Sequence, residues 1–177
     1  MQTLSIDRLS RLYHLRPSQL DRQRLLDACL GEAIERHLEF DLSAAGVGDD
    51  EEICLRLVEV PLSFSLGQSQ SATSQHWSSI ISRHIRLELE RGGPNVLRYR
   101  SRVHALLAFA EDVARGQLQR SWAWNQIGLA DLGMEAGPEL ARTQLVSALL
   151  REPAALCAVF GRLAERRCLV SWLAALT

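Results

Sequence analysis

Two pairs of side chains are the first candidates for a metal site or for acid–base catalysis. His76 and His84 lie eight residues apart, about 80° out of alignment on a helix of 3.6 residues per turn. Paired metal ligands on a helix are about three or four residues apart. His104 and Glu111 would share one helix face, but the sequence places no nucleophile near them, so general acid–base chemistry has little support. We predict neither a metal site nor catalytic residues.

The short polar loops do not complete a catalytic motif either. The stretch GQSQS at 67–71 lacks the closing glycine of a nucleophile elbow, and RGGPN at 91–95 lacks the spacing of a phosphate-binding loop. All 20 basic residues are arginines, which excludes lysine chemistry such as Schiff bases. We therefore predict that the chain is not an enzyme and takes no cofactor.

Arginines are concentrated in the middle of the chain, next to an acidic segment. Eight of them lie between residues 83 and 120, against four acidic residues, whereas residues 41–59 carry six acidic residues against Arg56 alone. Guanidinium groups suit planar pairs with carboxylates. The leading interpretation is an ion-pair network within the fold or across a subunit contact.

The same arginines allow a second interpretation. Arg98, Arg100 and Arg102, with Tyr99 between them, have the residue types that contact phosphates and stack on bases. The alternative function is therefore a nucleic-acid-binding regulatory protein that uses the basic stretch from Arg98 to Arg102.

Two tryptophans, Trp122 and Trp124, form the WAW stretch that follows Arg120. In an extended segment the two rings point to one face, whereas on a helix they diverge by about 160°. We expect both rings to pack in the core through an extended or irregular corner. If the stretch is helical, one ring anchors the segment and the other suits a partner surface. The candidate interaction residues are Arg98, Tyr99, Arg100, Arg102, Arg120, Trp122 and Trp124.

Helices and strands alternate in the first part of the chain. Apolar residues at helical spacing predict a helix over 18–39, with Ser18 as its N-cap. Alternation with one slip predicts strand over 53–66. Pro61 cannot donate to a ladder, so it marks an edge, a bulge or a break between two strand pieces. A second helix is expected to begin at Ser71 or Ser74 and to end by Gly92, although its residues 87–90 also alternate like a strand.

The remaining pattern is a strand at 95–101, a helix closed by Gly116, and only helices from Gly137 onward, the first with Pro138 near its start. The predicted fold is therefore α+β, with a small two- to three-stranded sheet packed by helices and an all-helical C-terminal part. We expect an α+β domain at 1–130 and a helical extension at 131–177 packed on it, or one single domain.

Composition fits a folded protein in a reducing compartment. Hydrophobic residues make up 47% of the 177 residues, enough for a core. The four cysteines stand among apolar residues, which predicts buried free thiols and fits a reducing cytoplasm. The first residues carry charges and no apolar run, so we expect no signal peptide, no membrane span and a cytoplasmic location.

Three segments together resemble the large proteins encoded with bacterial contractile injection systems, the phage-tail-like particles, some of which are tape-measure-like. They are DDEEICLRLVEVPLSFSL, NVLRYRSRVHALLAFAEDVARGQLQRSWAWNQIGL and QLVSALLREPAALCAVFGRLAERRCLVSWLAAL. The resemblance implies a structural or assembly role without chemistry, with protein partners among the components of such a particle. Nucleic acid is not expected as a partner, because the acidic segment can neutralise the arginines. Glycines and prolines break this chain into short elements, so we expect a compact domain or accessory relative and not a ruler.

Overall fold

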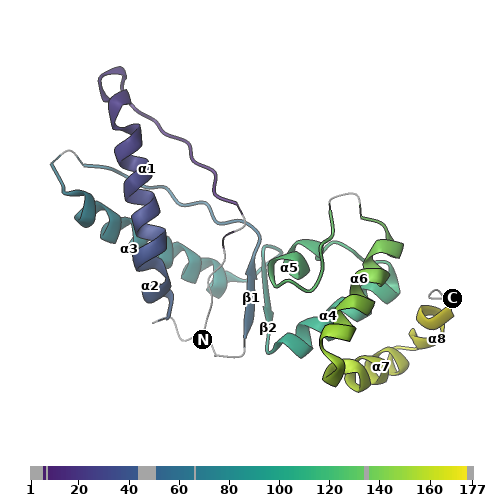
Figure 1. The fold of residues 1–177 in the computed structure, drawn as a ribbon. Helices are drawn as coiled ribbons and strands as arrows, with labels where there is room; N and C mark the ends of the chain where they lie inside the picture. Colours follow the sequence, from purple (N-terminus) through teal and green to yellow (C-terminus); the bar gives the residue numbers. More distant parts are fainter. Residues whose placement is uncertain (1–5, 7, 44–50, 66, 134–135, 175–177) are drawn as a thin grey trace. The chain divides into compact units, whose positions relative to one another are not determined.

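A computed structural model describes residues 6, 8–43, 51–65, 67–133 and 136–174 (Figure 1). The chain has a helix-rich α+β fold, as predicted, and its described residues form one two-stranded antiparallel sheet. It divides into two compact units: unit 1 is Met1–Asp49 with Leu57–Gly93, and unit 2 is Asp50–Arg56 with Pro94–Thr177. The division expected after residue 130 lies inside unit 2, whose core draws on residues from both sides of that point.

Unit 1 begins with a nearly continuous helical stretch. A 3₁₀ turn at Pro17–Arg22 leads into α1 (Gln23–Glu32), a π-helical segment at Ala33–Leu38, and α2 (Glu39–Ser43). The predicted helix over 18–39 is thus confirmed and extended at both ends. Its start differs from the prediction, because proline suits the first helical position and Arg16 takes the N-cap position expected of Ser18.

The second helix of unit 1, α3, spans Gln70–Arg91. Its N-cap is Ser69, whose hydroxyl accepts the backbone N–H of Ala72 at 3.3 Å, so neither serine predicted as the cap has that role. The helix continues to Gly92, which has φ 64°. The strand-like alternation of residues 87–90 is therefore helical in the structure.

Serine hydroxyls line the face of α3 that is buried in unit 1. Thr73, Ser74, Ser78 and Ser82 are all at most 1% exposed. Ser74 donates to Glu32 at 3.1 Å and Ser78 donates to Asp41 at 2.6 Å. Small side chains allow the helices to approach closely, and these bonds satisfy the buried hydroxyls. The spacing of apolar residues does not indicate this buried face, because serine is a polar residue.

Extended segments complete unit 1 without forming a sheet. The segment before Pro17 runs beside α1 (Figure 1) and is held by Tyr13, which donates to Asp27 at 2.6 Å. Trp77 holds the segment 57–65 by donating from its indole to the carbonyl of Ser63 at 2.8 Å. The strand predicted over 53–66 is therefore wrong beyond residue 55. The alternation of residues 57–65 reflects side chains that pack on helices and not a ladder; residue 66 lies outside the described residues.

Unit 2 contains the sheet. Strand β1 (Glu52–Leu55) pairs antiparallel with β2 (Val96–Tyr99), and Glu52 stands opposite Tyr99. The helices follow in the order α4 (Arg102–Arg115), α5 (Ser121–Gln126), α6 (Pro138–Arg151), α7 (Leu156–Glu165) and α8 (Leu169–Ala174), with a 3₁₀ turn at Pro153–Ala155. Two bonds tie β1 to α5: the Cys54 thiol reaches the carbonyl of Ala123 at 3.6 Å, and Gln126 donates to Leu55 at 3.0 Å.

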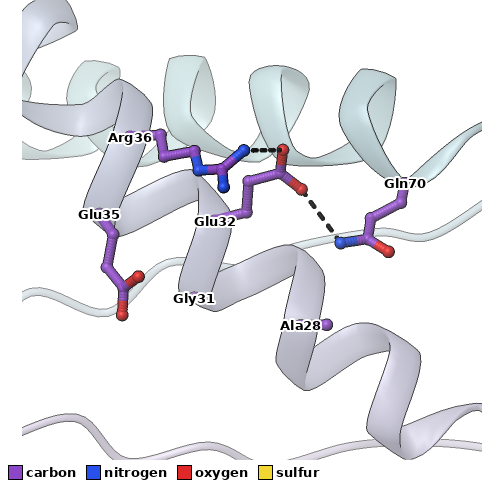
Figure 2. A pocket seen from close by; sticks show the side chains of 6 residues that line it. All are labelled: Ala28, Gly31, Glu32, Glu35, Arg36 and Gln70. Atoms are coloured by element: carbon purple, nitrogen blue, oxygen red, sulfur yellow. Dashed lines mark hydrogen bonds and ion pairs between the residues drawn. The ribbon is translucent and has the colours of Figure 1, made fainter.

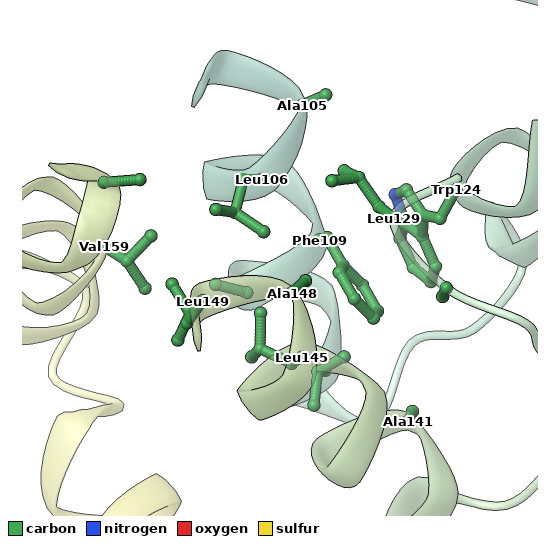
Figure 3. Packing of buried hydrophobic residues seen from close by; sticks show 14 of the residues in the cluster. Ala105, Leu106, Phe109, Trp124, Leu129, Ala141, Leu145, Ala148, Leu149 and Val159 are labelled. Carbon is green, nitrogen blue, oxygen red and sulfur yellow. The ribbon is translucent and has the colours of Figure 1, made fainter. Parts of the chain in front are cut away.

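The core of unit 2 is assembled between α4, α5, α6 and α7 (Figure 3). Phe109 of α4 packs against Trp124 of α5 with ring centroids 4.5 Å apart. Leu145 of α6 and Val159 of α7 approach from the other side, and all four side chains are fully buried. The predicted helix caps are confirmed here, since Gly116 closes α4 at φ 69° and Pro138 opens α6.

The turn between α7 and α8 holds an arginine in a conformation that favours glycine. Arg167 has φ 57°, and the backbone N–H groups of Arg167 and Cys168 donate to the carbonyls of Ala164 and Leu163, both at 2.9 Å. This is the pattern of a Schellman turn, in which the left-handed residue is usually glycine because any Cβ is strained there.

We expect Arg167→Gly to raise the free energy of unfolding by about 0.5–1 kcal/mol, because glycine adopts this backbone without strain. Urea denaturation followed by circular dichroism measures the change. Arg166→Gly is the control, because Arg166 has φ −81°. Glycine there relieves no strain, adds flexibility and removes the contact of Arg166 with Glu111 at 3.6 Å, so stability should fall. Equal destabilisation by both substitutions would contradict the left-handed conformation of Arg167.

Candidate functional site

Two arginines of the basic stretch are paired with the acidic segment inside unit 2. Arg98 on β2 contacts Glu51 at 2.9 Å, and Arg102 contacts Glu52 at 3.7 Å. The antiparallel pairing of β1 with β2 places these groups side by side. The predicted intramolecular ion pairs between the two segments are therefore confirmed at these positions.

Arg102 also connects several elements of unit 2. It forms an ion pair with Glu152 at the end of α6, and its Nη1 donates to the carbonyl of Ile127 at 2.7 Å. The guanidinium thus links the start of α4 to the residue after α5 and to the residue after α6. Its Nε and Nη1 groups are thus used within the fold, which gives Arg102 a structural role.

Tyr99 and Arg100 differ in their surroundings. Tyr99 is 3% exposed, and burial, followed by the nearby thiol of Cys54, raises the pKa of its hydroxyl. Its ring can stack on a nucleic-acid base only if it leaves the core. Arg100 is exposed, and its backbone N–H donates to His104 at 3.3 Å. Within the described residues, no ion pair of the Arg100 side chain is found.

The WAW stretch is helical, so its two tryptophans diverge. Trp124 is completely buried, whereas Trp122 is half-buried at the edge of the same core. The expectation that both rings pack inward through an extended corner is wrong, because α5 spans both positions. The helical alternative holds, with Trp124 as the anchor and Trp122 as the more accessible ring.

Arg120 pairs with a buried carboxylate that the sequence did not single out. Asp112 on α4 is 2% exposed, and Arg120 contacts it through Nε at 2.8 Å and Nη2 at 2.9 Å. Burial raises the pKa of Asp112, and the Arg120 guanidinium opposes that effect. Because Arg120 directly precedes α5, this pair sets where α5 begins relative to α4, and so helps to position Trp124.

A second carboxylate on α4 gathers three arginines. Glu111 is contacted by Arg162 at 2.6 Å and by Arg115 and Arg166, each at 3.6 Å. Only the pair with Arg115, four residues away on the same helix, could have been found from spacing. The other two come from α7 and its C-terminal end, about fifty residues later in the chain, and meet Glu111 through the packing of α7 on α4.

A hollow in unit 1 lies between α1 and the start of α3 (Figure 2). It has a volume of about 370 Å³ and is lined by Ala28, Gly31, Glu32, Glu35, Arg36 and Gln70. The Glu32 carboxylate accepts bonds from Gln70 and Ser74, both at 3.1 Å, and pairs with Arg36 at 3.7 Å. These contacts make Glu32 a link between α1 and α3.

The histidines and cysteines have ordinary surroundings. His84 contacts the carbonyl of Ile80 at 2.9 Å, and the described ranges contain no group of three His, Cys, Asp or Glu residues placed to hold a metal ion. Cys29 and Cys54 are buried thiols, as predicted, but Cys157 is exposed and Cys168 half-buried. In the described part of the chain, no single helix is long and apolar enough to cross a membrane; α6 with Pro153–Glu165 passes that test only as a pair bent by 106°.

We expect Arg120→Ala to lower the free energy of unfolding at neutral pH by about 2 kcal/mol, because it leaves the buried Asp112 carboxylate without its partner. Thermal and urea denaturation measure the loss. Adding Asp112→Asn to Arg120→Ala should recover part of it, because the buried group is then neutral. A double variant no more stable than Arg120→Ala alone would show that the lost stability has another source.

The pH dependence of stability supplies a separate test of Asp112. Its pKa is higher in the folded chain than the ordinary 3.8, so the folded state holds this proton more tightly. The resulting stabilisation is present below the unfolded value and is lost as the pH rises through the folded value. The stability of the native chain relative to Asp112→Asn should therefore fall as the pH rises from below 3.8 towards neutrality. A relative stability that rises over this range would contradict the raised pKa.

Comparison with protein-family models, with curated proteins and with solved structures found no match to this chain.

Proposed function

We propose that this chain is a non-enzymatic structural or assembly protein that acts through protein–protein contacts, in a contractile injection system. The supporting observation is the exposed apolar surface of its last two helices. Val170 is 80% exposed, Leu173 45% and Phe160 37%. Exposed apolar side chains on neighbouring helices are typical of interaction sites in folded proteins.

The two helices present this surface together. The ring of Phe160 on α7 lies 5.9 Å from the ring of Trp172 on α8, so the two helices pack against each other. Val170 and Leu173, three residues apart, share one side of α8. Val159 and Leu163 bury the opposite side of α7 in the core. A helix that is apolar on its outer as well as its inner side is usually covered on both.

The setting of the proposed contact comes from the sequence resemblance. The third resembling segment, residues 144–176, contains the second half of α6, together with α7 and α8. Proteins encoded with contractile injection systems join large assemblies, in which a small accessory chain works through surfaces of this kind. We therefore propose that the partners are components of the particle.

Protein contacts have more support than the nucleic-acid alternative. Ion pairs hold Arg98 and Arg102, and Tyr99 is buried. Of the basic stretch, Arg100 alone offers an exposed guanidinium without an ion pair to a described residue. One such cation gives little of the phosphate neutralisation on which nucleic-acid affinity depends.

Purified tube, sheath and baseplate proteins of a particle encoded beside the chain should include at least one that binds it. Val170→Asp should weaken that binding at least about tenfold, or 1.4 kcal/mol, because it places a charge in the apolar contact. Isothermal titration calorimetry measures the affinity. Leu12→Asp is the matched control, since Leu12 is 81% exposed in unit 1, and it should leave binding unchanged. If none of these components binds, or if both variants bind normally, the proposed role of this surface fails.

A further inference from the structure

We infer that the apolar surface of α7 and α8 receives an acidic amphipathic helix of a protein partner; this inference rests on the proposed function and specifies the chemistry of the contact. We call Phe160, Ala164, Val170 and Leu173 the α7–α8 surface. All four are exposed. Apolar residues of a partner helix, repeating every three or four positions, match a surface made by two adjoining helices.

The charge around this surface is positive. Residues 153–174 contain three arginines, Arg162, Arg166 and Arg167, against Glu165 alone, so the net charge is 3 − 1 = +2. Arg167 stands three residues from both Ala164 and Val170. With 3.8 Å between successive Cα atoms, its Cα is at most about 11 Å from theirs. Arg167 thus lies in the turn that joins the two halves of the surface.

The neighbouring arginines outnumber the carboxylates that contact them. Glu111 is the common partner of Arg115, Arg162 and Arg166, and Arg162 also contacts Glu165 at 3.4 Å. Arg162 and Arg166 both face Glu111 through Nε, and the Nη atoms of Arg166 have no partner among the described residues. Such an Nη pair matches the two oxygens of an incoming carboxylate.

Arg167 adds an independent observation. It occupies a left-handed position, at φ 57°, where glycine would be free of strain, and its side chain makes no ion pair with a described residue. No described residue of unit 2 therefore offsets the strain of placing an arginine there. Strained residues of this kind concentrate at functional positions, which points to a carboxylate supplied from outside the chain.

Charge also favours an acidic protein partner over a second copy of this chain or a membrane as the group that covers the apolar surface. A second copy would bring two surfaces of the same +2 charge together, and such repulsion opposes pairing. An anionic membrane would match the charge, but a fluid layer of headgroups gains little from guanidinium groups that Glu111 holds in place. A helix that carries Asp or Glu beside its leucines satisfies both the apolar and the charged groups.

The test uses three fluorescein-labelled helical peptides of about 15 residues, long enough to form a helix on binding. They share one leucine face and carry glutamate, glutamine or arginine on the other. Fluorescence anisotropy with the full chain should give at least tenfold tighter binding of the glutamate peptide than of the glutamine peptide, a difference that shrinks as salt is added. The arginine peptide should bind most weakly.

Arg167→Gly separates the charge effect from folding, since we expect it to stabilise the chain. It should weaken binding of the glutamate peptide several-fold and leave the glutamine peptide unaffected. Arg83→Gln, at an exposed position of unit 1, is the control and should change neither affinity. Val170→Asp should weaken both peptides.

Every other result overturns the inference. Equal affinity for the glutamate and glutamine peptides would exclude an acidic partner but would leave the proposed protein contact intact. Failure of all three peptides, together with a concentration-dependent dimer in sedimentation that Val170→Asp abolishes, would assign the surface to a second copy. Failure of the peptides with sedimentation on phosphatidylserine vesicles, but not on phosphatidylcholine vesicles, would assign it to a membrane.

Discussion

The packing of the Trp124 ring against Phe109 is the contact on which the arrangement of unit 2 depends. Helix α5 has only six residues, too few to be stable without tertiary contacts. Its buried indole supplies them, with ring centroids 4.5 Å apart. Asn125 then fixes the chain that leaves α5, because its side chain bonds both the N–H and the carbonyl of Leu132, at 2.9 and 2.8 Å. The path towards α6 follows from these bonds.

Charged groups fix the helices around this core. The successive residues Glu111 and Asp112 of α4 point to different neighbours, because adjacent residues on a helix diverge by about 100°. Asp112 meets Arg120 ahead of α5, and Glu111 meets Arg162 of α7. Each carboxylate thus holds one neighbouring helix against α4, and guanidinium groups suit this role because they present several donors in one plane. The inner side of α7 is then buried, and its outer side remains exposed.

Elements with a strong repeat could be predicted, and those that depend on distant contacts could not. The helix at 18–39, the helix closed by Gly116 and the helices after Gly137 follow from apolar spacing and from glycine and proline at their ends. Residues 57–65 alternate like a strand but form none. Alternation indicates an extended chain with one buried side, and it does not show that a neighbouring strand is present to pair with it. In α3, bonds to Glu32 and Asp41 are what make serines suitable for burial.

The sequence by itself determined the α+β class and most helix positions, because periodicity is a local property of the chain. It also indicated the pairing of the acidic segment with the central arginines, because the two segments carry opposite charge. Only the tertiary structure decided that one tryptophan is buried and the other half-exposed, and that Tyr99 lies in the core. It also decided that Arg162 and Arg166 share Glu111 with Arg115. These outcomes depend on which helix packs on which, and that choice is made by contacts between residues far apart in the chain.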